Sequence, residues 1–184
     1  QLQIRHVHNL GFQQPLSNVF FESARISRGD IVKMSEIDYD EVSSLIIPGG
    51  FGAAKNLSNW AFKQDACKVI PQVENLILHC VNNSKPIVSL CISPVLIARS
   101  LFNSTYSPVL TLGSQYEDSD YDINDLHKKI SLLGVKTKNI SVNNICVDED
   151  LKIISAPCYM MNAKIDQVFI NIKQAVSRLK SFLD

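Results

Sequence analysis

The stretch KPIVSLCISPVLIARS, residues 85–100, is the segment on which the fold of this chain is organised. Its first half is a short apolar run with β-branched residues behind a proline, which is typical of the start of a buried strand. Its second half begins with Ser93, which can cap a helix, and Pro94, which a first helical turn tolerates. The stretch therefore predicts a strand that runs into a helix, with Cys91 at the junction.

A strand that turns sharply into a helix, with a nucleophile at the corner, is a nucleophile elbow. At such a corner the thiol of Cys91 is expected above the edge of the sheet, near free N–H groups at the helix start. Those groups and the helix dipole favour the thiolate form. The alternative is a buried core cysteine, since cysteine is among the most buried residue types and the usual elbow glycines are missing.

The length and composition predict a single domain that binds neither nucleic acid nor an anionic membrane. The 184 residues can bury roughly 70% of their unfolded surface. The 18 basic residues balance the 18 acidic ones without a basic run, so neither nucleic acid nor an anionic membrane is an expected partner. Five cysteines without a C-x-x-C pair favour reduced thiols in the cytoplasm over a zinc site or a disulfide framework. No cofactor or metal is expected.

Apolar periodicity predicts strands and helices in alternation. Strands are expected at residues 44–48, 86–90, 109–112, 140–142, 145–147 and 153–156, and helices at 19–26, 69–83, from 94 onward, 126–133 and 165–183. This order predicts a mostly parallel sheet with helices on both faces. Ligands of such sheets bind at the carboxyl ends of the strands.

Four turns follow predicted strands and are therefore expected at one edge of the sheet: Gly49–Gly50, Cys91, Gly113 and residues 157–159. The glycine pair either makes a tight turn, which is the default, or lets a backbone N–H approach a ligand closely. This convergence favours Cys91 as a cysteine in a cleft.

Two other groups of polar residues are interpreted as structural. Glu22 and Arg25 fall on one face of a predicted helix and indicate a solvated, ion-paired surface. His79 lies beside the apolar stripe of the helix at 69–83, where a lone histidine is more often structural than catalytic. Residues 56–60 are polar and predict a loop with one helical turn.

Four stretches together resemble a known family. These stretches are ESARISRGDI (22–31), LIIPGGFGAAKNLSNWA (45–61), KPIVSLCISPVL (85–96) and VDEDLKIISAPCYM (147–160). They are similar, in register over nearly the whole chain, to the enhancing-lycopene-biosynthesis (ElbB) subfamily of the ThiJ/PfpI superfamily. The resemblance implies a flavodoxin-like, class I glutamine amidotransferase-like three-layer α/β sandwich that forms a homodimer.

The resemblance also implies an activity. The superfamily includes proteases, chaperones, amidotransferase-like domains and glutathione-independent glyoxalases, and the bacterial members of this subfamily are similar to the last group. It thus implies conversion of small 2-oxoaldehydes such as methylglyoxal to hydroxy acids through a cysteine hemithioacetal. By position Cys91 matches the nucleophile, and Gly50 and Ile92 match the residues whose backbone N–H groups hold the oxyanion. The alternative is a non-catalytic dimer, redox-sensing or chaperone-like, with a vestigial site.

The chain departs from the family pattern in two places. It begins after the first β-α-β unit, whose first turn usually supplies a carboxylate base, so residues upstream of Gln1 are expected to supply it. Nothing in the sequence positions Glu22 as a substitute. Ile92 stands where several branches carry a histidine, which makes a cysteine protease a poor interpretation. Because eukaryotic relatives include mitochondrial proteins, a mitochondrial location is the alternative to a cytoplasmic one.

Overall fold

The computed structural model describes residues 3–4, 17–29 and 31–184, and the chain divides into two compact units, residues 1–38 and 39–184. In the first unit, strands β1 (Gln3–Ile4) and β2 (Ser17–Asn18) pair in antiparallel fashion. Helix α1 (Val19–Ile26) follows, and a single 3-10 turn, η1 (Met34–Glu36), comes later. Glu22 forms an exposed ion pair with Arg25 at 3.1 Å, which confirms the predicted ion-paired helix face.

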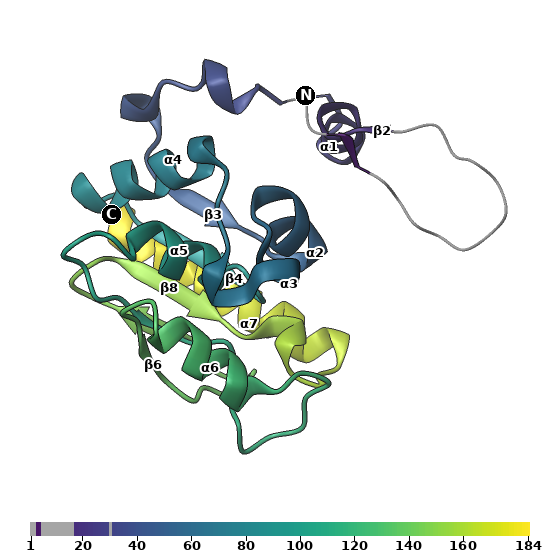
Figure 1. The fold of residues 1–184 in the computed structure, drawn as a ribbon, viewed down its shortest axis with the longest axis vertical. Coiled ribbons are helices and arrows are strands. Elements are labelled where there is room, and N and C mark those ends of the chain that lie inside the picture. Colours follow the sequence, from purple (N-terminus) through teal and green to yellow (C-terminus); the bar gives the residue numbers. More distant parts are fainter. Residues whose placement is uncertain (1–2, 5–16, 30) are drawn as a thin grey trace, which may run out of the picture. The chain divides into compact units, whose positions relative to one another are not determined.

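The second unit is built on a four-stranded sheet with strand order β3-β4-β8-β7 (Figure 1). Strands β3 (Leu45–Ile47), β4 (Ile87–Leu90) and β8 (Ile153–Ala156) are parallel to one another. Strand β7 (Cys146–Asp148) pairs antiparallel with β8, because a tight turn connects the two. A separate parallel pair joins β5 (Val109–Leu110) to β6 (Lys136–Thr137). This is the mostly parallel, flavodoxin-like α/β arrangement that the sequence predicts.

Helices cover both faces of the sheet, as expected for a parallel sheet. Helix α7 (Ile165–Leu183) packs on the face that carries Val88 and Leu90 of β4 and Ile154 and Ala156 of β8. Helices α4 (Pro71–Asn82) and α5 (Pro94–Leu101) lie on the opposite side, and α6 (Ile123–Ser131) lies beside β6 (Figure 1). Shorter helical segments are η2 (Tyr39–Glu41), α2 (Gly50–Gly52), the π-helix η3 (Ala53–Leu57), α3 (Trp60–Lys63), η4 (Gln64–Ala66) and η5 (Cys158–Met160).

The two central strands, β4 and β8, are buried at every residue. Each carries one serine in an otherwise apolar sequence, and both serines are fully buried and hydrogen-bonded. Ser155 Oγ accepts from the N–H of Thr111 at 3.0 Å, and Ser89 Oγ lies 2.9 Å from Ser93 Oγ. Because an unpaired buried hydroxyl is costly, these bonds fix the β5 segment and the β4–α5 turn to the sheet.

Two element predictions are wrong. Residues 140–142 form no strand, since they lead into a turn and Val142 packs in the core. The strand predicted at 109–112 ends at Leu110, because the N–H of Thr111 bonds to the Ser155 side chain instead of a ladder. Residues 50–55 are helical where the sequence predicted no helix, and the loop with helical character expected at 56–60 joins the end of η3 to the start of α3. Within the described part of the chain, none of the helices has the length and apolar character that a membrane span requires.

His127 of α6 is a buried histidine held neutral by its surroundings. Its side chain is 6% exposed, and its Nε2 accepts a hydrogen bond from the N–H of Leu112 at 3.2 Å. Burial lowers the pKa of His127 below its ordinary value, because the charged form loses its hydration. As the pH falls below the ordinary histidine pKa of about 6.5, the unfolded chain therefore binds a proton that the folded chain does not.

We predict that the free energy of unfolding decreases as the pH is lowered from about 6.5 to about 5. His127→Gln should weaken this dependence, since the amide oxygen can accept from Leu112 N–H without binding a proton. Urea unfolding at a series of pH values measures the effect, with His79→Gln as the control for loss of a histidine elsewhere. An unchanged pH dependence in His127→Gln would assign the effect to other groups.

Candidate active site

Cys91 lies in the sharp turn between β4 and α5, as the sequence predicts. Its φ is +57°, in the left-handed region that a residue with a side chain occupies at a cost of about 1–2 kcal/mol. Its N–H donates to the carbonyl of Ala156 at 2.9 Å, which extends the β4–β8 ladder by one residue. Helix α5 begins at Pro94, so strand, strained cysteine and helix follow one another within a few residues.

Ser93 fixes this turn, although it does not cap α5 as predicted. It is fully buried and makes no side-chain cap bond to the helix. Its Oγ lies 2.9 Å from the carbonyl oxygen of Ile47 and 2.8 Å from that of Leu90, and it can donate its proton to either. The hydroxyl therefore ties the turn to the carboxyl ends of both β3 and β4.

The glycine pair after β3 packs directly against the Cys91 turn. Gly49 and Gly50 have φ values of +87° and +71°, which glycine adopts without strain. A Cβ atom on Gly49 would lie 2.3 Å from the carbonyl oxygen of Leu90 and 3.0 Å from Cys91 Cβ. Only glycine lets the two turns approach so closely, and α2 consequently begins beside Cys91.

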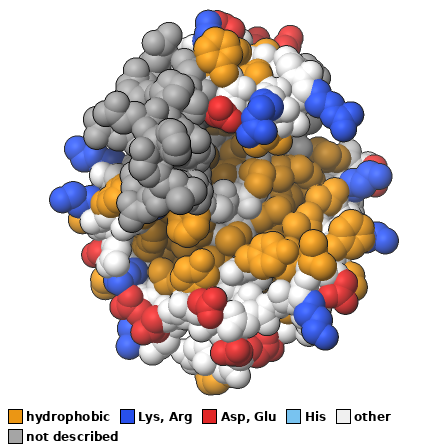
Figure 2. All heavy atoms as spheres, turned by 90° about the vertical axis from the view of Figure 1, so that its right-hand side faces the viewer, with side chains coloured by type: hydrophobic (Ala, Val, Ile, Leu, Met, Phe, Trp, Pro, Cys, Tyr) orange, Lys and Arg blue, Asp and Glu red, His pale blue; other side chains and the backbone are white. Residues whose placement is uncertain are grey.

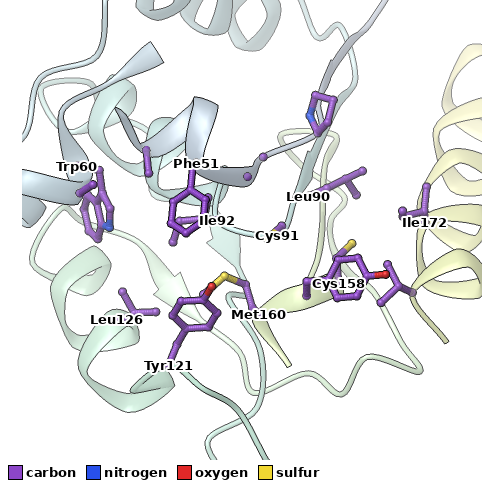
Figure 3. A pocket seen from close by; sticks show the side chains of 17 residues that line it. Phe51, Trp60, Leu90, Cys91, Ile92, Tyr121, Leu126, Cys158, Met160 and Ile172 are labelled. Carbon is purple, nitrogen blue, oxygen red and sulfur yellow. The ribbon is translucent and has the colours of Figure 1, made fainter. Parts of the chain in front are cut away.

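These turns open onto a cavity of about 540 Å³, in which Cys91 lies near the centre of the lining (Figure 3). The three residues with predicted site roles, Cys91, Gly50 and Ile92, all line it. Gly113, which the sequence also predicted at this edge of the sheet, does not line the cavity. The other lining residues are Pro48, Gly49, Phe51, Ala54, Trp60, Ala61, Leu90, Tyr121, Leu126, Cys158, Tyr159, Met160, Val168 and Ile172.

Two backbone N–H groups at the cavity have no protein acceptor among the described residues. The N–H of Ile92 follows Cys91 in the turn and makes no hydrogen bond there. The N–H of Gly50 opens α2, where the first N–H groups of a helix lack an intrahelical partner. Both residues line the cavity, and neither N–H is used within the described protein.

The five thiols divide by burial. Cys91 is partly exposed and the other four are buried. Burial raises the pKa of Cys67, Cys80 and Cys146 above the ordinary cysteine value. Burial also raises the pKa of Cys158 to about 12, against a smaller opposing effect of the Cys91 N–H. Cys158 therefore lies beside Cys91 on the cavity wall as a protonated thiol (Figure 3).

The described cavity wall holds no ready proton-transfer group. None of its residues is Asp, Glu, His, Lys or Arg, so the expected carboxylate is not among them. His79 is elsewhere, on α4, with its ring in edge-to-face contact with Tyr39 at 5.6 Å between centroids, in keeping with a structural role. The described residues contain no cluster of three or more His, Cys, Asp or Glu suited to a metal ion.

Several known proteins are similar to this chain, among them two curated relatives and a solved structure. The chain is 30% identical over 177 residues to the mitochondrial ES1 protein homolog of Rattus norvegicus, covering 96% of this chain and 65% of the relative. It is 32% identical over 163 residues to the mitochondrial glutamine amidotransferase-like class 1 domain-containing protein 3 of Homo sapiens, covering 88% of this chain and 59% of the relative. The chain thus spans less than two thirds of either relative.

Among solved structures, the chain is similar to an isoprenoid biosynthesis protein with an amidotransferase-like domain from Ehrlichia chaffeensis. The TM-score is 0.79 at 28% identity, over 93% of this chain and 73% of that one. No protein-family model matches the chain.

The fold and the cysteine turn define an α/β protein of the class I glutamine amidotransferase-like type. The relatives and the solved structure together support the ThiJ/PfpI-like superfamily for this chain. Their names do not single out the ElbB subfamily.

We predict that iodoacetamide near pH 6.5 labels Cys91 at least about tenfold faster than any other cysteine, because the other four are buried. Limited labelling followed by peptide mapping measures the order. Labelling in guanidinium, where all five should react, is the control. Faster labelling of Cys80 or Cys146 than of Cys91 would contradict the accessible-elbow geometry.

Gly49→Ala should destabilise the protein by at least about 2 kcal/mol, since the added Cβ overlaps the Leu90 carbonyl and φ is positive. Gly52→Ala is the matched control. Gly52 has φ −60° inside a helix and open space around its Cβ position, so alanine there should stabilise by about 0.5–1 kcal/mol. Denaturant unfolding of both variants checks this difference, and equal stabilities would show that the two turns separate at little cost.

Proposed function

We propose that this protein is a glutathione-independent, glyoxalase-like enzyme that converts small 2-oxoaldehydes such as methylglyoxal to 2-hydroxy acids. One observation carries the proposal: an accessible cysteine on a strained turn shares a cavity with two unpaired N–H groups. A thiol and paired amide donors are the groups that addition to an aldehyde requires.

In the first step the Cys91 thiolate adds to the aldehyde carbon. A C–S bond forms and the carbonyl electron pair moves to oxygen, which gives a hemithioacetal. The N–H groups of Gly50 and Ile92 stabilise the developing oxyanion, and each such donor contributes about 3 kcal/mol in comparable enzymes. The close approach of the two turns at Gly49 supports these roles, because Gly50, Cys91 and Ile92 line the same cavity.

In the second step a base removes the proton from the former aldehyde carbon, and a proton returns to the adjacent carbon through an enediol. The product is a thioester of the hydroxy acid. Water then hydrolyses the thioester, releases the acid and restores the thiolate. The net reaction adds one water to the 2-oxoaldehyde and needs neither an oxidant nor a reductant. The superfamily resemblance assigns the base to a carboxylate, which no described lining residue provides.

The proposal includes a homodimer and a small-molecule aldehyde as its partners, with no role for nucleic acid or a membrane. Both curated relatives are named as mitochondrial proteins. Their names favour a mitochondrial location for this protein over the cytoplasmic one that the cysteine content predicts.

A redox role for Cys91 is the second candidate, within the alternative of a non-catalytic redox-sensing or chaperone-like dimer. It is favoured by Cys158, which lies beside Cys91, and by the lack of a base on the described cavity wall. A peroxide would oxidise the Cys91 thiolate to a sulfenic acid while its O–O bond breaks. The Cys158 thiol would then displace water from that sulfur and form a disulfide.

We predict that Cys91→Ala lowers glutathione-independent lactate formation from methylglyoxal by at least about 100-fold, because the hemithioacetal cannot form. Cys146→Ala, at a buried cysteine outside the cavity, should retain activity. Stereospecific lactate assays measure the product, and circular dichroism confirms the fold of each variant.

Full activity in Cys91→Ala would rule out the cysteine mechanism. The redox role would be favoured if the wild type is inactive with methylglyoxal and forms a disulfide under mild peroxide. That disulfide would appear as a mass loss of two hydrogens and as a cross-linked peptide pair that contains Cys91 and Cys158.

A further inference from the structure

The cavity at Cys91 has an uncharged, mostly hydrocarbon wall. Of its 17 lining residues none is charged, and the side-chain polar groups are limited to two thiols, two tyrosine hydroxyls and one indole N–H. Figure 2 shows hydrophobic side chains gathered over this face, with the charged side chains around its margin. None of the described lining residues offers an anionic ligand group a cation to replace its lost hydration, and the ammonium of Lys55, which does not line the cavity, lies 4.8 Å from the centre of the Phe51 ring.

The cavity is large for a three-carbon substrate. About 540 Å³ falls within the range of about 300–1,000 Å³ that accommodates drug-sized ligands. Methylglyoxal carries only one methyl group beyond its two carbonyls. It would leave most of this apolar wall in contact with water, so most of the available binding energy would go unused.

Aromatic side chains lie to one side of the thiol. Phe51, Trp60 and Tyr121 come from α2, α3 and the segment before α6, and in Figure 3 they border the region next to Cys91. Aromatic rings favour offset-stacked and edge-to-face contacts with another ring. A ligand whose carbonyl sits at Cys91 would direct its side group toward these three rings.

We propose that the Cys91 cavity selects uncharged 2-oxoaldehydes that carry a large apolar side group, aryl groups above all. The reaction in this inference rests on the proposed function. The binding preference of the cavity is inferred only from the residues that line it. Phenylglyoxal is the simplest probe, and methylglyoxal and 4-carboxyphenylglyoxal are its small and charged counterparts.

The first experiment compares kcat/KM for these three aldehydes with the purified wild-type protein, each value divided by the aldehyde's rate with a free thiol. Phenylglyoxal should exceed methylglyoxal by at least about tenfold, the scale of discrimination that apolar pockets give. It should exceed 4-carboxyphenylglyoxal by at least about tenfold as well, because the carboxylate loses its hydration without a partner. Equal values for phenylglyoxal and methylglyoxal would overturn the inference and leave the proposed function standing.

The second experiment measures binding without chemistry. Trp60 is the only tryptophan of the chain, is 4% exposed and lines the cavity, so its fluorescence reports on this site. In Cys91→Ala, acetophenone should quench this emission with saturation, at a Kd at least about tenfold below that of acetone. Benzoate, which has a similar size but a negative charge, should not saturate.

Two phenylalanines provide a matched pair of variants. Phe51 lines the cavity and is 72% exposed, whereas Phe62 is 69% exposed and does not line it. Phe51→Ala should weaken acetophenone binding and lower kcat/KM for phenylglyoxal at least about fivefold more than for methylglyoxal. Phe62→Ala should change neither.

The outcomes separate the two proposals. Selective binding of acetophenone without turnover of any aldehyde would uphold the cavity's selectivity and reject the proposed reaction. Equal binding of acetophenone and benzoate, or equal effects of Phe51→Ala and Phe62→Ala, would overturn the selectivity. Trp60 emission that changes only with protein concentration would also overturn the selectivity, because it would identify a second copy of the chain as the occupant of the cavity.

Discussion

The close contact between the turn at Gly49 and the turn at Leu90–Cys91 is the constraint on which the site depends. Two adjacent parallel strands end there, and a side chain on Gly49 would collide with the backbone of its neighbour. Because the strands are held in register by the sheet, the two turns meet at a fixed distance. That distance brings the Gly50 and Ile92 amides to one cavity with the thiol, and the buried hydroxyl of Ser93 holds both strand ends in place.

The sequence predicted this arrangement well where apolar runs meet turn residues. The runs at β3, β4 and β8 are short and apolar and are followed by proline or cysteine, so their order and the edge at which they end could be inferred. The sequence did not show that β3 is less buried than β4 and β8, with Ile46 44% exposed. The short strand β6 was missed because Lys136–Thr137 carries no apolar alternation. The helical residues 50–55 were missed because packing, and not helix propensity, stabilises residues of such mixed polarity.

The character of the cavity could not be predicted from the sequence. Its wall combines Trp60, Tyr121, Met160 and Ile172, which come from four segments far apart along the chain. Each of these residues fits an ordinary core or surface pattern when read alone. Only the fold shows that they line one cavity with Cys91 and that none of the described lining residues is charged. Apolar periodicity predicts the edge of the sheet at which the strands end, but it does not predict which side chains lie above that edge.

An apolar cavity disfavours a thiolate, and the two cysteines on its wall differ in how far that wall buries them. Cys158 is buried by the same wall, and its pKa of about 12 is the result of losing water around a charge. Cys91 is only partly buried in the turn between β4 and α5, although both cysteines have a positive φ, +57° at Cys91 and +49° at Cys158. The β4–α5 turn places the Cys91 thiol at the border between water and an apolar wall. The proposed reaction uses both, because water solvates a thiolate and the wall binds an uncharged substrate.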